Sequence, residues 1–473
     1  MSLIAPIETD LDKLAELAGP SGLRAGDDIA SYLAEPRDLF RGHAAAVLRP
    51  ETTEQVAGIV RHCAERRIGI IPYGGGTGLV GGQLTSDGPF PIVLSLERMN
   101  RVRAIVPDEN AIIVEAGVIL QDVQQAAENA GRLFPLSLAA QGSARIGGNL
   151  ATNAGGVQVL RYGNARDLCL GIEAVLPSGE ILHGLKTLRK DNTGYDLRHL
   201  LIGAEGTLGI ITAAALKLYP QPGAVVTAML TVPSPEAAIG LLRHLQDQLG
   251  DNVTAFELIK GQGIRFLDMV MPSFNDPLAD APQWRVLTEI AGPEGSDLET
   301  RTEAAFERAF ENELATDGVI ASSEGQRAHM WNMREHLPEG NRRVGSISSH
   351  DISLPIGRIA AFLGKADEIV QGIDADFRIN CFGHLGDGNL HYNVFPPEGR
   401  AHKDYDNLRK PVKQAVHDLV HEMDGSVSAE HGIGRLKTQD LVRYGDPAKL
   451  AAMRAIKAAL DPNGIMNPGA VLT

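Results

Sequence analysis

Hydrophobic residues in the first half of the chain follow two different spacings. After Thr52, which begins a helix-capping pattern, apolar residues recur at the three- and four-residue intervals of a helix buried on one face. Short unbroken apolar runs, typical of buried strands, lie between such helices. The pattern predicts helices over 52–67 and 119–131 and strands over 68–72, 91–96, 111–118 and 172–182, the last one folded at a Pro-Ser-Gly-Glu turn.

The second half of the chain carries longer helical patterns between its strands. The composition changes around residues 220–223, where we expect a domain boundary. Beyond it, residues 235–249 have the apolar spacing of a core-facing helix, and Phe306, Phe310 and Leu314 form a second such stripe. A final helix carries Leu450, Met453, Ile456 and Leu460. The mixture of strands and helices predicts an α+β protein.

Glycine is the one residue whose distribution is unusual. Of the 52 glycines, 15 lie in three short segments, 72–82, 135–156 and 190–212. A loop rich in glycine exposes many backbone N–H groups and lets a ligand approach closely, so it can bind phosphate without a helix. Three such segments, each flanked by strands, indicate one extended ligand held between two small α+β lobes.

The first segment contains a pattern that points to a different cofactor. Residues 76–81 fit the GxGxxG fingerprint of nicotinamide dinucleotide binding, and Glu97 stands near the position of the ribose-binding acid. That fingerprint requires a helix to begin at the glycines. The residues that follow prevent such a helix, since they include Gly82, Gly88, Pro89 and Pro91. We therefore reject a nicotinamide site here.

Composition and charge exclude several functional classes. The net charge of −15 repels a phosphate backbone, so we expect no nucleic-acid partner. No apolar run approaches the ~20 residues of a membrane span, and the first residues do not resemble a secretion signal. Three isolated cysteines, Cys63, Cys169 and Cys381, fit reduced thiols and cannot hold a four-thiolate cluster. These features predict a cytoplasmic protein.

Two polar clusters in the second half carry candidate metal ligands. His384 and His391 flank Gly-Asp-Gly, a tight turn that would bring the two imidazoles together, and the two-residue period of a strand puts Asn393 on the His391 face. Glu430 and His431 lie further along, before two glycines. Two histidines and a carboxylate suit a catalytic divalent metal, zinc first, with manganese, iron or cobalt as alternatives. Each residue alone is also compatible with an ordinary structural role.

Together, the glycine segments resemble those of the FAD-dependent oxidoreductases of the vanillyl-alcohol oxidase type. The resemblance runs from about Arg49 to the C-terminus and rests on PYGGGTGL, IGGNLATNAGG and GAEGTLGIIT. It implies an N-terminal arm (1–38), a two-lobed FAD-binding domain (39–220), an α+β substrate and metal domain (221–430) and a C-terminal segment that returns to the first domain (431–473). The implied FAD-binding residues are Pro72, Gly74, Gly75, Gly76, Thr77, Gly78, Leu79, Ser143, Gly147, Gly148, Asn149, Thr152, Asn153, Gly155, Gly156, Gly206, Thr207 and Ile210.

The family attaches FAD in two ways, and the first loop distinguishes them. Some relatives bind flavin covalently through a histidine of that loop. This chain has Thr77 there and neither histidine nor cysteine in the loop. We therefore predict non-covalent FAD.

The polar clusters FGHLGDGNLHYN and SAEHGIG are similar to signatures of one branch of that family, the D-2-hydroxy-acid dehydrogenases, which include D-lactate and D-2-hydroxyglutarate dehydrogenases. The resemblance implies that a divalent metal is held by His384, His391 and Glu430 and that His431 is the catalytic base. It also implies that Arg334 grips the substrate carboxylate, and we expect Asn393 to bind substrate as well.

The chain departs from the branch at one position that bears on the substrate. Many 2-hydroxyglutarate dehydrogenases carry a lysine before the DISLP segment that helps recognise the distal carboxylate, whereas this chain has Ser349. The departure weakens the dicarboxylate assignment and keeps D-lactate or another short hydroxy acid in consideration. Arg342 and Arg343 lie close in sequence and could compensate.

Several functions stay open at this stage. The leading hypothesis is a dehydrogenase that oxidises a D-2-hydroxy acid and passes electrons to a quinone or an electron-transfer flavoprotein, with a homodimer expected. An oxidase using molecular oxygen, a metallohydrolase using the two histidines and Glu430, and a flavin-binding protein without activity are alternatives. A relative of alkylglycerone-phosphate synthase is disfavoured, because nothing in the sequence supports a long lipid chain.

Overall fold

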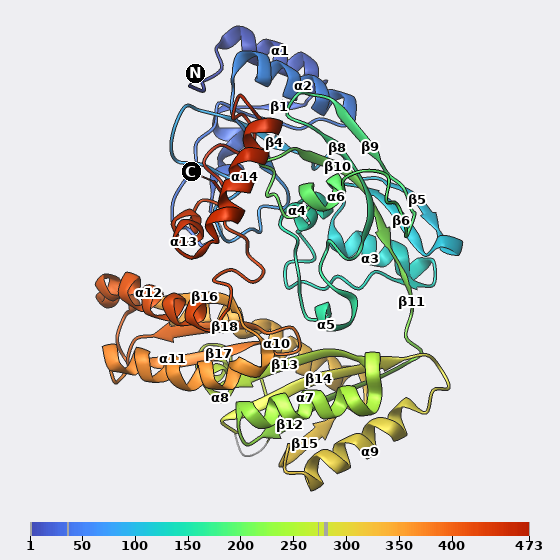
Figure 1. The fold of residues 1–473 in the computed structure, drawn as a ribbon, viewed down its shortest axis with the longest axis vertical. Coiled ribbons are helices and arrows are strands. Elements are labelled where there is room, and N and C mark those ends of the chain that lie inside the picture. The colour runs from blue at the N-terminus through green and yellow to red at the C-terminus, as the bar shows by residue number, and fades with distance from the viewer. Residues whose placement is uncertain (1, 36, 273, 279–281, 473) are drawn as a thin grey trace. The chain divides into compact units, whose positions relative to one another are not determined.

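The protein is described here from a computed structural model, which covers residues 2–35, 37–272, 274–278 and 282–472. The chain divides into two compact units, each coloured by sequence in Figure 1. Unit 1 comprises residues 1–155, 163–221 and 430–473, and unit 2 comprises residues 156–162 and 222–429. The chain therefore leaves unit 1 twice and returns to it at Glu430, which follows directly on the last residue of unit 2.

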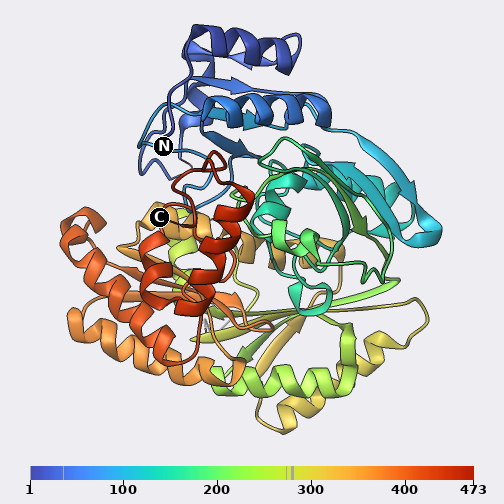
Figure 2. The same ribbon diagram turned by 45° about the horizontal axis from the view of Figure 1, so that its top comes forward.

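Unit 1 contains two larger sheets and the two-stranded sheet β7-β11. One has the strand order β1-β2-β4-β3 with parallel pairing of β4 to both β2 and β3, and the other is antiparallel with the order β5-β6-β10-β8-β9. Helices α1 and α2 run side by side, as Figure 2 shows. The elements are α1 (Glu8–Ala18), β1 (Leu23–Arg24), β2 (Ala46–Leu48), α2 (Thr53–Arg66), β3 (Ile70–Tyr73), β4 (Ile92–Ser95), β5 (Val102–Val106), β6 (Ala111–Glu115), α3 (Leu120–Asn129), β7 (Arg132–Leu133), α4 (Ile146–Ala151), β8 (Cys169–Val175), β9 (Ile181–Gly184), α6 (Leu197–Leu201), β10 (Ile210–Lys217), β11 (Tyr219–Pro220), α13 (Thr438–Tyr444) and α14 (Pro447–Leu460).

The predicted elements of unit 1 are present close to their expected bounds. Helix α2 begins after Thr52, whose side chain accepts a hydrogen bond from the N–H of Gln55. The reciprocal half of the capping pattern differs, because the Gln55 side chain accepts from Glu51 instead. Strands β8 and β9 form the predicted hairpin, with Gly179 in the left-handed region of its turn at φ +82°.

The segment that carries the GxGxxG pattern contains no helix. Residues 74–91, all of them described, are irregular between β3 and β4. Glu97 already has two partners within the protein, since its Oε1 accepts hydrogen bonds from Tyr32 (2.8 Å) and Arg49 (3.0 Å). The structural context that a nicotinamide fingerprint requires is therefore absent from this segment.

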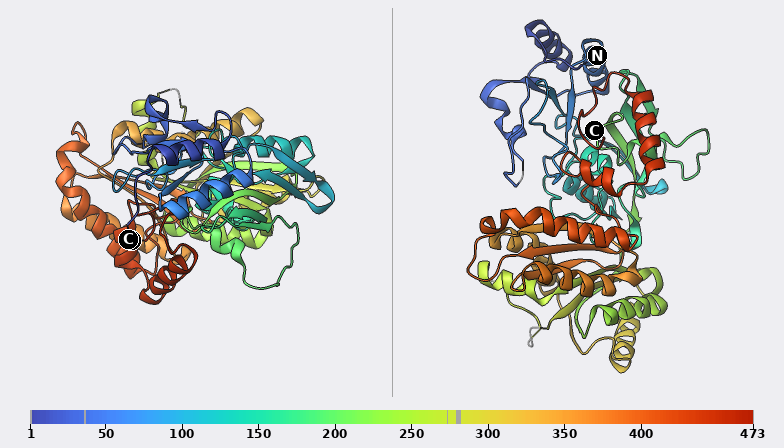
Figure 3. Two further views of the ribbon diagram at one scale, coloured as in Figure 1. Left: turned by 90° about the horizontal axis from the view of Figure 1, so that it is seen from above. Right: turned by 60° about the vertical axis from the view of Figure 1, so that its left-hand side comes forward.

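Unit 2 contains a seven-stranded antiparallel sheet with the order β15-β12-β14-β13-β17-β18-β16. Helices α7, α9, α11 and α12 form one layer against it, while α8 packs on β17 and α10 packs on α8; Figure 3 shows α11 and α12 along the sheet. The elements are α5 (Val159–Tyr162), β12 (Ala224–Val232), α7 (Pro235–Leu249), β13 (Val253–Lys260), α8 (Gly261–Val270), β14 (Trp284–Gly292), α9 (Leu298–Glu311), β15 (Asp317–Ile320), α10 (Glu324–Val344), β16 (Ser348–Ser353), α11 (Ile359–Ile373), β17 (Arg378–His384), β18 (Asn389–Phe395) and α12 (Asp406–Glu422).

The predicted turn between the two histidines is a hairpin. Strands β17 and β18 pair antiparallel, and Gly388 has φ +86° in the connection. On β18 the side chains alternate: Tyr392 is fully buried and its hydroxyl donates to Asp367 of α11 at 2.8 Å, whereas its neighbours His391 and Asn393 belong to the opposite face. The two-residue period read from the sequence is therefore the one that the sheet adopts.

None of the helices in the described residues is both long enough and apolar enough to cross a membrane. All three cysteines are buried and unpaired with one another, in keeping with the reduced thiols expected from the sequence.

Tyr392→Phe should lower the free energy of unfolding of the protein by about 0.5–1.5 kcal/mol, because it removes one buried hydrogen bond and leaves the ring in place. Thermal and urea unfolding would measure the loss. Tyr195→Phe is the matched control, since Tyr195 is 96% exposed and its substitution should have no effect. Equal stabilities for wild type and Tyr392→Phe would contradict the inward orientation of Tyr392.

Candidate functional site

The glycine-rich segments of unit 1 line one pocket, which contains about 1060 Å³ of space between atoms, part of it open to solvent. The predicted cofactor residues that line it are Pro72, Gly74, Gly75, Gly76, Thr77, Gly78, Gly147, Gly148, Asn149, Thr152, Gly206 and Ile210. The three segments that the sequence singled out are thus brought to one place.

The wall of this pocket depends on two backbone segments that approach each other closely. A Cβ atom added at Gly75 would lie 2.1 Å from the carbonyl oxygen of Ser143, so no other residue fits without a shift of backbone. Where Gly74 faces Gly148, an added Cβ would lie 3.2 Å from the Gly148 Cα. Exposed backbone N–H groups and the absence of side chains are what a bound pyrophosphate needs.

One buried atom of the pocket has an unused hydrogen-bonding capacity. Asn149 is 6% exposed, lines the pocket, and its Oδ1 accepts no hydrogen bond in the structure. A buried acceptor without a donor is unfavourable, and a ligand that carries an N–H group, as the flavin ring does, would satisfy it. The pocket therefore fits FAD in backbone chemistry and polar complement.

Other predicted cofactor residues lie away from the pocket lining. Ser143 contributes the carbonyl that faces Gly75, Asn153 bonds the Arg166 N–H through its side chain (2.9 Å), and the Thr207 hydroxyl donates to Ala204 (2.7 Å). Leu79 and Gly155 are likewise outside the lining, and Gly156 groups with unit 2. Direct contact of these six residues with a cofactor stays a prediction.

A buried carboxylate that the sequence analysis missed joins the pocket to the C-terminal segment of unit 1. Glu205 lines the pocket, and its two oxygens accept the N–H groups of Ile433 (2.7 Å) and Gly434 (2.8 Å). Burial raises the pKa of Glu205, although these two N–H donors act to lower it. No local pattern could have revealed this contact, since its partners lie 228 and 229 residues away.

Arg435 reinforces the same connection. Its Nη1 donates to the carbonyl oxygens of Gly81 (2.9 Å) and Gly82 (3.1 Å), and its Nη2 donates to Asn467 (2.8 Å). Burial lowers the pKa of Arg435 to about 10, against the opposing influence of Glu205. The C-terminal segment is therefore fixed to the first glycine loop by charge-assisted hydrogen bonds.

His431 reaches the pocket because the backbone turns after it. His431 is among the lining residues, and the turn places Gly432 at φ +79° and Gly434 at φ +50°. A Cβ at Gly432 would lie 2.6 Å from Glu205 Oε1, so glycine is required for space as well as for conformation. The turn allows the adjacent residues Glu430 and His431 to converge, and with Asp351 they form a group whose ligand atoms lie within 4.8 Å of one another.

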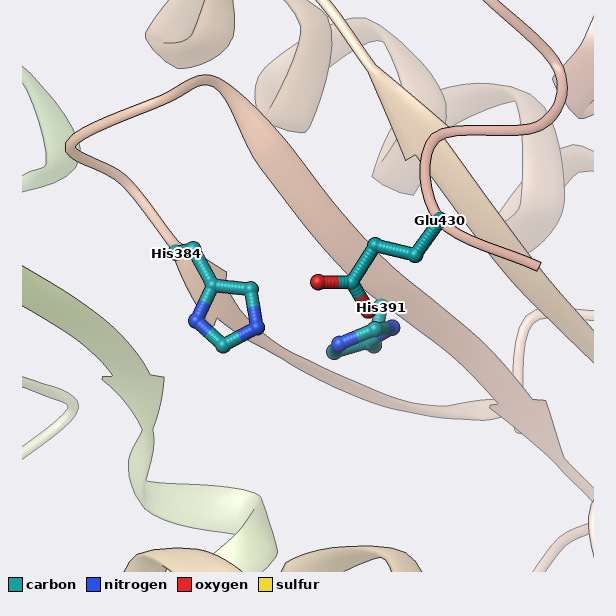
Figure 4. A group of neighbouring side chains, drawn as sticks. All are labelled: His384, His391 and Glu430. Carbon is teal, nitrogen blue, oxygen red and sulfur yellow. The ribbon is translucent and has the colours of Figure 1, made fainter. Parts of the chain in front are cut away.

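The three predicted metal ligands come together (Figure 4). One ligand atom from each of His384, His391 and Glu430 lies within 4.8 Å of the others. The rings of the two histidines are 5.7 Å apart between centroids and nearly perpendicular. Donors bound to one tetrahedral zinc ion at about 2.1 Å lie roughly 3.4 Å apart, so these side chains can bind one ion by moving closer together. Two imidazoles and one carboxylate are also the donor types of catalytic zinc sites, and the residues therefore fit a divalent metal.

Arg334 is buried and already has a partner. Its Nε donates to Glu257 Oε2 at 2.7 Å, and its guanidinium lies over the Phe382 ring, 4.8 Å from the centroid. Glu257 Oε1 lies 2.5 Å from His384 Nδ1. Burial alone would raise the pKa of Glu257, but the charges of Arg334 and His384 together with their hydrogen bonds lower it to about 2. Arg334 is only 5% exposed, so it is a buried arginine of helix α10 and not a surface residue.

The remaining residues considered for substrate binding differ in their surroundings. Asn393 is buried, and its side-chain amide donates to the carbonyl of His391 at 2.9 Å. Ser349 is exposed and bonds the Ser346 hydroxyl at 2.8 Å. Arg342 and Arg343 are exposed and both bond Glu339 of the same helix. The two arginines thus occupy an ion pair on the surface of α10.

The sequence matches two described protein families. The match to the FAD linked oxidases, C-terminal domain, covers residues 221–471, and the match to the FAD binding domain covers residues 44–184. Together they span most of both units.

Two curated relatives with similar sequences are D-2-hydroxyglutarate dehydrogenases. The chain is 39% identical over 438 residues to the mitochondrial D-2-hydroxyglutarate dehydrogenase of Bos taurus, covering 90% of this chain and 77% of the relative. It is 35% identical over 465 residues to the D-2-hydroxyglutarate dehydrogenase of Stutzerimonas stutzeri, covering 98% of both chains.

Solved structures share the fold at low sequence identity. A p-cresol methylhydroxylase with bound substrate matches with a TM-score of 0.77 at 16% identity and covers 99% of this chain and 98% of its own. An alkyldihydroxyacetonephosphate synthase matches with a TM-score of 0.75 at 18% identity, covering 99% and 87%. These neighbours confirm the two-domain α+β fold of the vanillyl-alcohol oxidase type.

Gly75→Ala should weaken FAD binding, because the added Cβ must displace the Ser143 carbonyl. Overpacking of this kind costs about 1–3 kcal/mol of folding stability, and the backbone shift that relieves it changes the wall of the pocket. FAD content after gel filtration and fluorescence titration of the apoprotein would measure it. Gly364→Ala on α11 is the control, since an added Cβ there meets no atom within 4 Å. Normal FAD affinity in Gly75→Ala would contradict the role of this backbone approach.

Proposed function

The chain belongs to the FAD-linked oxidases of the vanillyl-alcohol oxidase type, in their D-2-hydroxy-acid dehydrogenase branch, and on that basis we propose that it oxidises a D-2-hydroxy acid to the 2-oxo acid. FAD binds non-covalently in the pocket of unit 1. A divalent metal, zinc first, is held by His384, His391 and Glu430. The observation that carries the proposal is the position of two adjacent residues: Glu430 lies with the two histidines, and His431 lines the glycine-rich pocket.

Different residues of the chain have different roles in the proposed reaction. Arg334 offers a buried guanidinium for the substrate carboxylate, although its Nη2 also lies 2.7 Å from Glu257 Oε2. His431 takes the proton of the α-hydroxyl, since histidine is the side chain that most often acts as a general base. When bound, FAD supplies the acceptor for the hydride from Cα, and the metal supplies a positive charge that favours the deprotonated hydroxyl. The substrate loses two electrons and two protons in total.

D-2-hydroxyglutarate is the first candidate substrate, because it is named for relatives that cover most of this chain. D-lactate is the second, and a specific observation favours it. Where many 2-hydroxyglutarate dehydrogenases have a lysine, Ser349 is present, and the neighbouring Arg342 and Arg343 are engaged with Glu339 on the helix surface. A second substrate carboxylate would therefore have to find its cation elsewhere.

The electron acceptor and the cellular location are part of the same proposal. We propose a quinone or an electron-transfer flavoprotein as acceptor, a homodimer as the assembly and the cytoplasm as the compartment. Relatives from animals and plants are named as mitochondrial, so the compartment differs among the proteins that this chain resembles. Reduction of molecular oxygen by the flavin is the alternative, and an oxygen electrode would detect it.

Anaerobic titration of the yellow protein with D-2-hydroxyglutarate, D-lactate and their L-enantiomers tests the proposal. We expect one D-acid to bleach the flavin band near ~450 nm, and prior treatment with EDTA to abolish the bleaching, since the metal orients the substrate. Added zinc should restore it. A yellow protein that no hydroxy acid bleaches would overturn the function and keep the fold. A colourless protein that hydrolyses an ester or amide would favour the metallohydrolase instead.

His431→Ala should bind FAD with a normal visible spectrum yet reduce it about 10²–10⁴-fold more slowly with the substrate, because the proton acceptor is lost. Stopped-flow absorbance under anaerobic conditions would measure the rate. The matched control is His183→Ala, on the exposed edge strand β9 of the same unit, which should keep the wild-type rate. Flavin reduction by His431→Ala at the wild-type rate would refute the assignment of the base.

A further inference from the structure

We propose that Glu257 is a positioning residue that orients His384 toward the metal and holds Arg334 beside the same site. The inference rests on the proposed function, since it takes His384 as a metal ligand and Arg334 as the substrate-binding cation. Glu257 itself is neither a metal ligand nor a substrate-binding residue in this proposal. It acts by fixing the direction of two other side chains through the two oxygens of one carboxylate.

The sheet places Glu257 directly beside His384. Strands β13 and β17 pair antiparallel, and Glu257 stands opposite His384 in the register. The distance from Glu257 Oε1 to His384 Nδ1 is 2.5 Å, and the Glu257 side chain has no exposed surface. An ionised carboxylate only accepts hydrogen bonds, so Nδ1 of His384 must donate. A neutral imidazole that donates from Nδ1 has its lone pair at Nε2, the form that can bind a metal ion.

The second oxygen of Glu257 serves Arg334. Oε2 lies 2.7 Å from both Nε and Nη2 of Arg334, and the guanidinium also lies over the Phe382 ring. The carboxylate and the guanidinium cancel in charge, which allows both groups to remain buried in unit 2. A movement of Glu257 would therefore disturb a metal ligand and a substrate-binding cation together.

The second candidate histidine ligand, His391, stands opposite a different carboxylate. Asp351 stands opposite His391 in the register of β16 and β18, but its Oδ1 is 3.9 Å from His391 Nδ1 and also accepts from Asn389 (3.0 Å). Glu257 is thus the closer carboxylate partner of the two. A carboxylate that orients a metal-binding histidine typically raises metal affinity by 10–100-fold.

A second buried glutamate of the same sheet supplies the matched control. Glu289 on β14 is 5% exposed and also pairs with an arginine, Arg327, at 3.2 Å. It accepts a hydrogen bond from Trp331 as well, at 3.0 Å. Neither of these partners is a candidate metal ligand, so Glu289→Gln reproduces the loss of a buried charge without touching His384.

The experiment measures zinc affinity of the FAD-loaded full-length protein, by competition with a chromophoric chelator after metal removal. We expect Glu257→Gln to bind zinc 10–100-fold more weakly than wild type, with an unchanged visible flavin spectrum, and Glu289→Gln to bind as wild type does. In a His384→Ala background, Glu257→Gln should cause no additional loss. That last result separates orientation of His384 from a general loss of stability, since a destabilised sheet would weaken zinc binding in either background.

The other possible outcomes would contradict either the metal site or the role of Glu257. Wild-type protein that binds no zinc, manganese, iron or cobalt would remove the metal from the proposed function, and this inference with it. Wild type and Glu257→Gln with equal zinc affinities would overturn only the role of Glu257. If Glu257→Gln fails to fold, Glu257→Gln combined with Arg334→Met removes both charges of the buried pair and permits the same measurement. Loss of fold in that variant too would make Glu257 a stability residue.

Discussion

The pocket of unit 1 exists because stretches of backbone that are far apart in sequence approach each other without intervening side chains. The carbonyl of Ser143 occupies the place where a Cβ of residue 75 would be, and Gly74 lies similarly close to Gly148. Such contacts leave N–H groups directed at a ligand and remove the bulk that would keep it away. They also explain why the glycines are concentrated in a few segments, since the requirement applies only where these segments meet.

Hydrogen bonds of buried charged side chains fix the C-terminal segment of unit 1 at this pocket. Glu205 accepts the N–H groups of Ile433 and Gly434, and Arg435 donates to carbonyl oxygens of the first glycine loop. A buried carboxylate and a buried guanidinium are tolerated only when their hydrogen bonds are satisfied, so these contacts fix the segment in one conformation. His431, at the start of that segment, gains a defined position at the pocket although it lies in irregular structure.

Unit 2 uses a different principle, the register of antiparallel strands. Opposite positions on β13 and β17 place Glu257 beside His384, and the hairpin of β17 and β18 brings His384 near His391. On the opposite face of the sheet, Tyr392 bonds Asp367 of α11. Because strand residues alternate between faces, one strand can contribute a metal ligand and a core residue at adjacent positions.

The sequence by itself determined the features that depend on local geometry. The three glycine segments, the Gly-Asp-Gly turn, the alternation around His391 and the capped start of α2 were all predicted and are all present, because turns and periodicity are encoded within a few residues. The family signatures likewise identified the FAD-linked fold. Tertiary structure alone decided which buried charges meet: Arg334 with Glu257 across 77 residues, His384 with Glu257 across 127 and Glu205 with the turn across 228. Such pairs depend on how whole elements pack, and a glutamate that will be buried carries no local mark that distinguishes it from one on the surface.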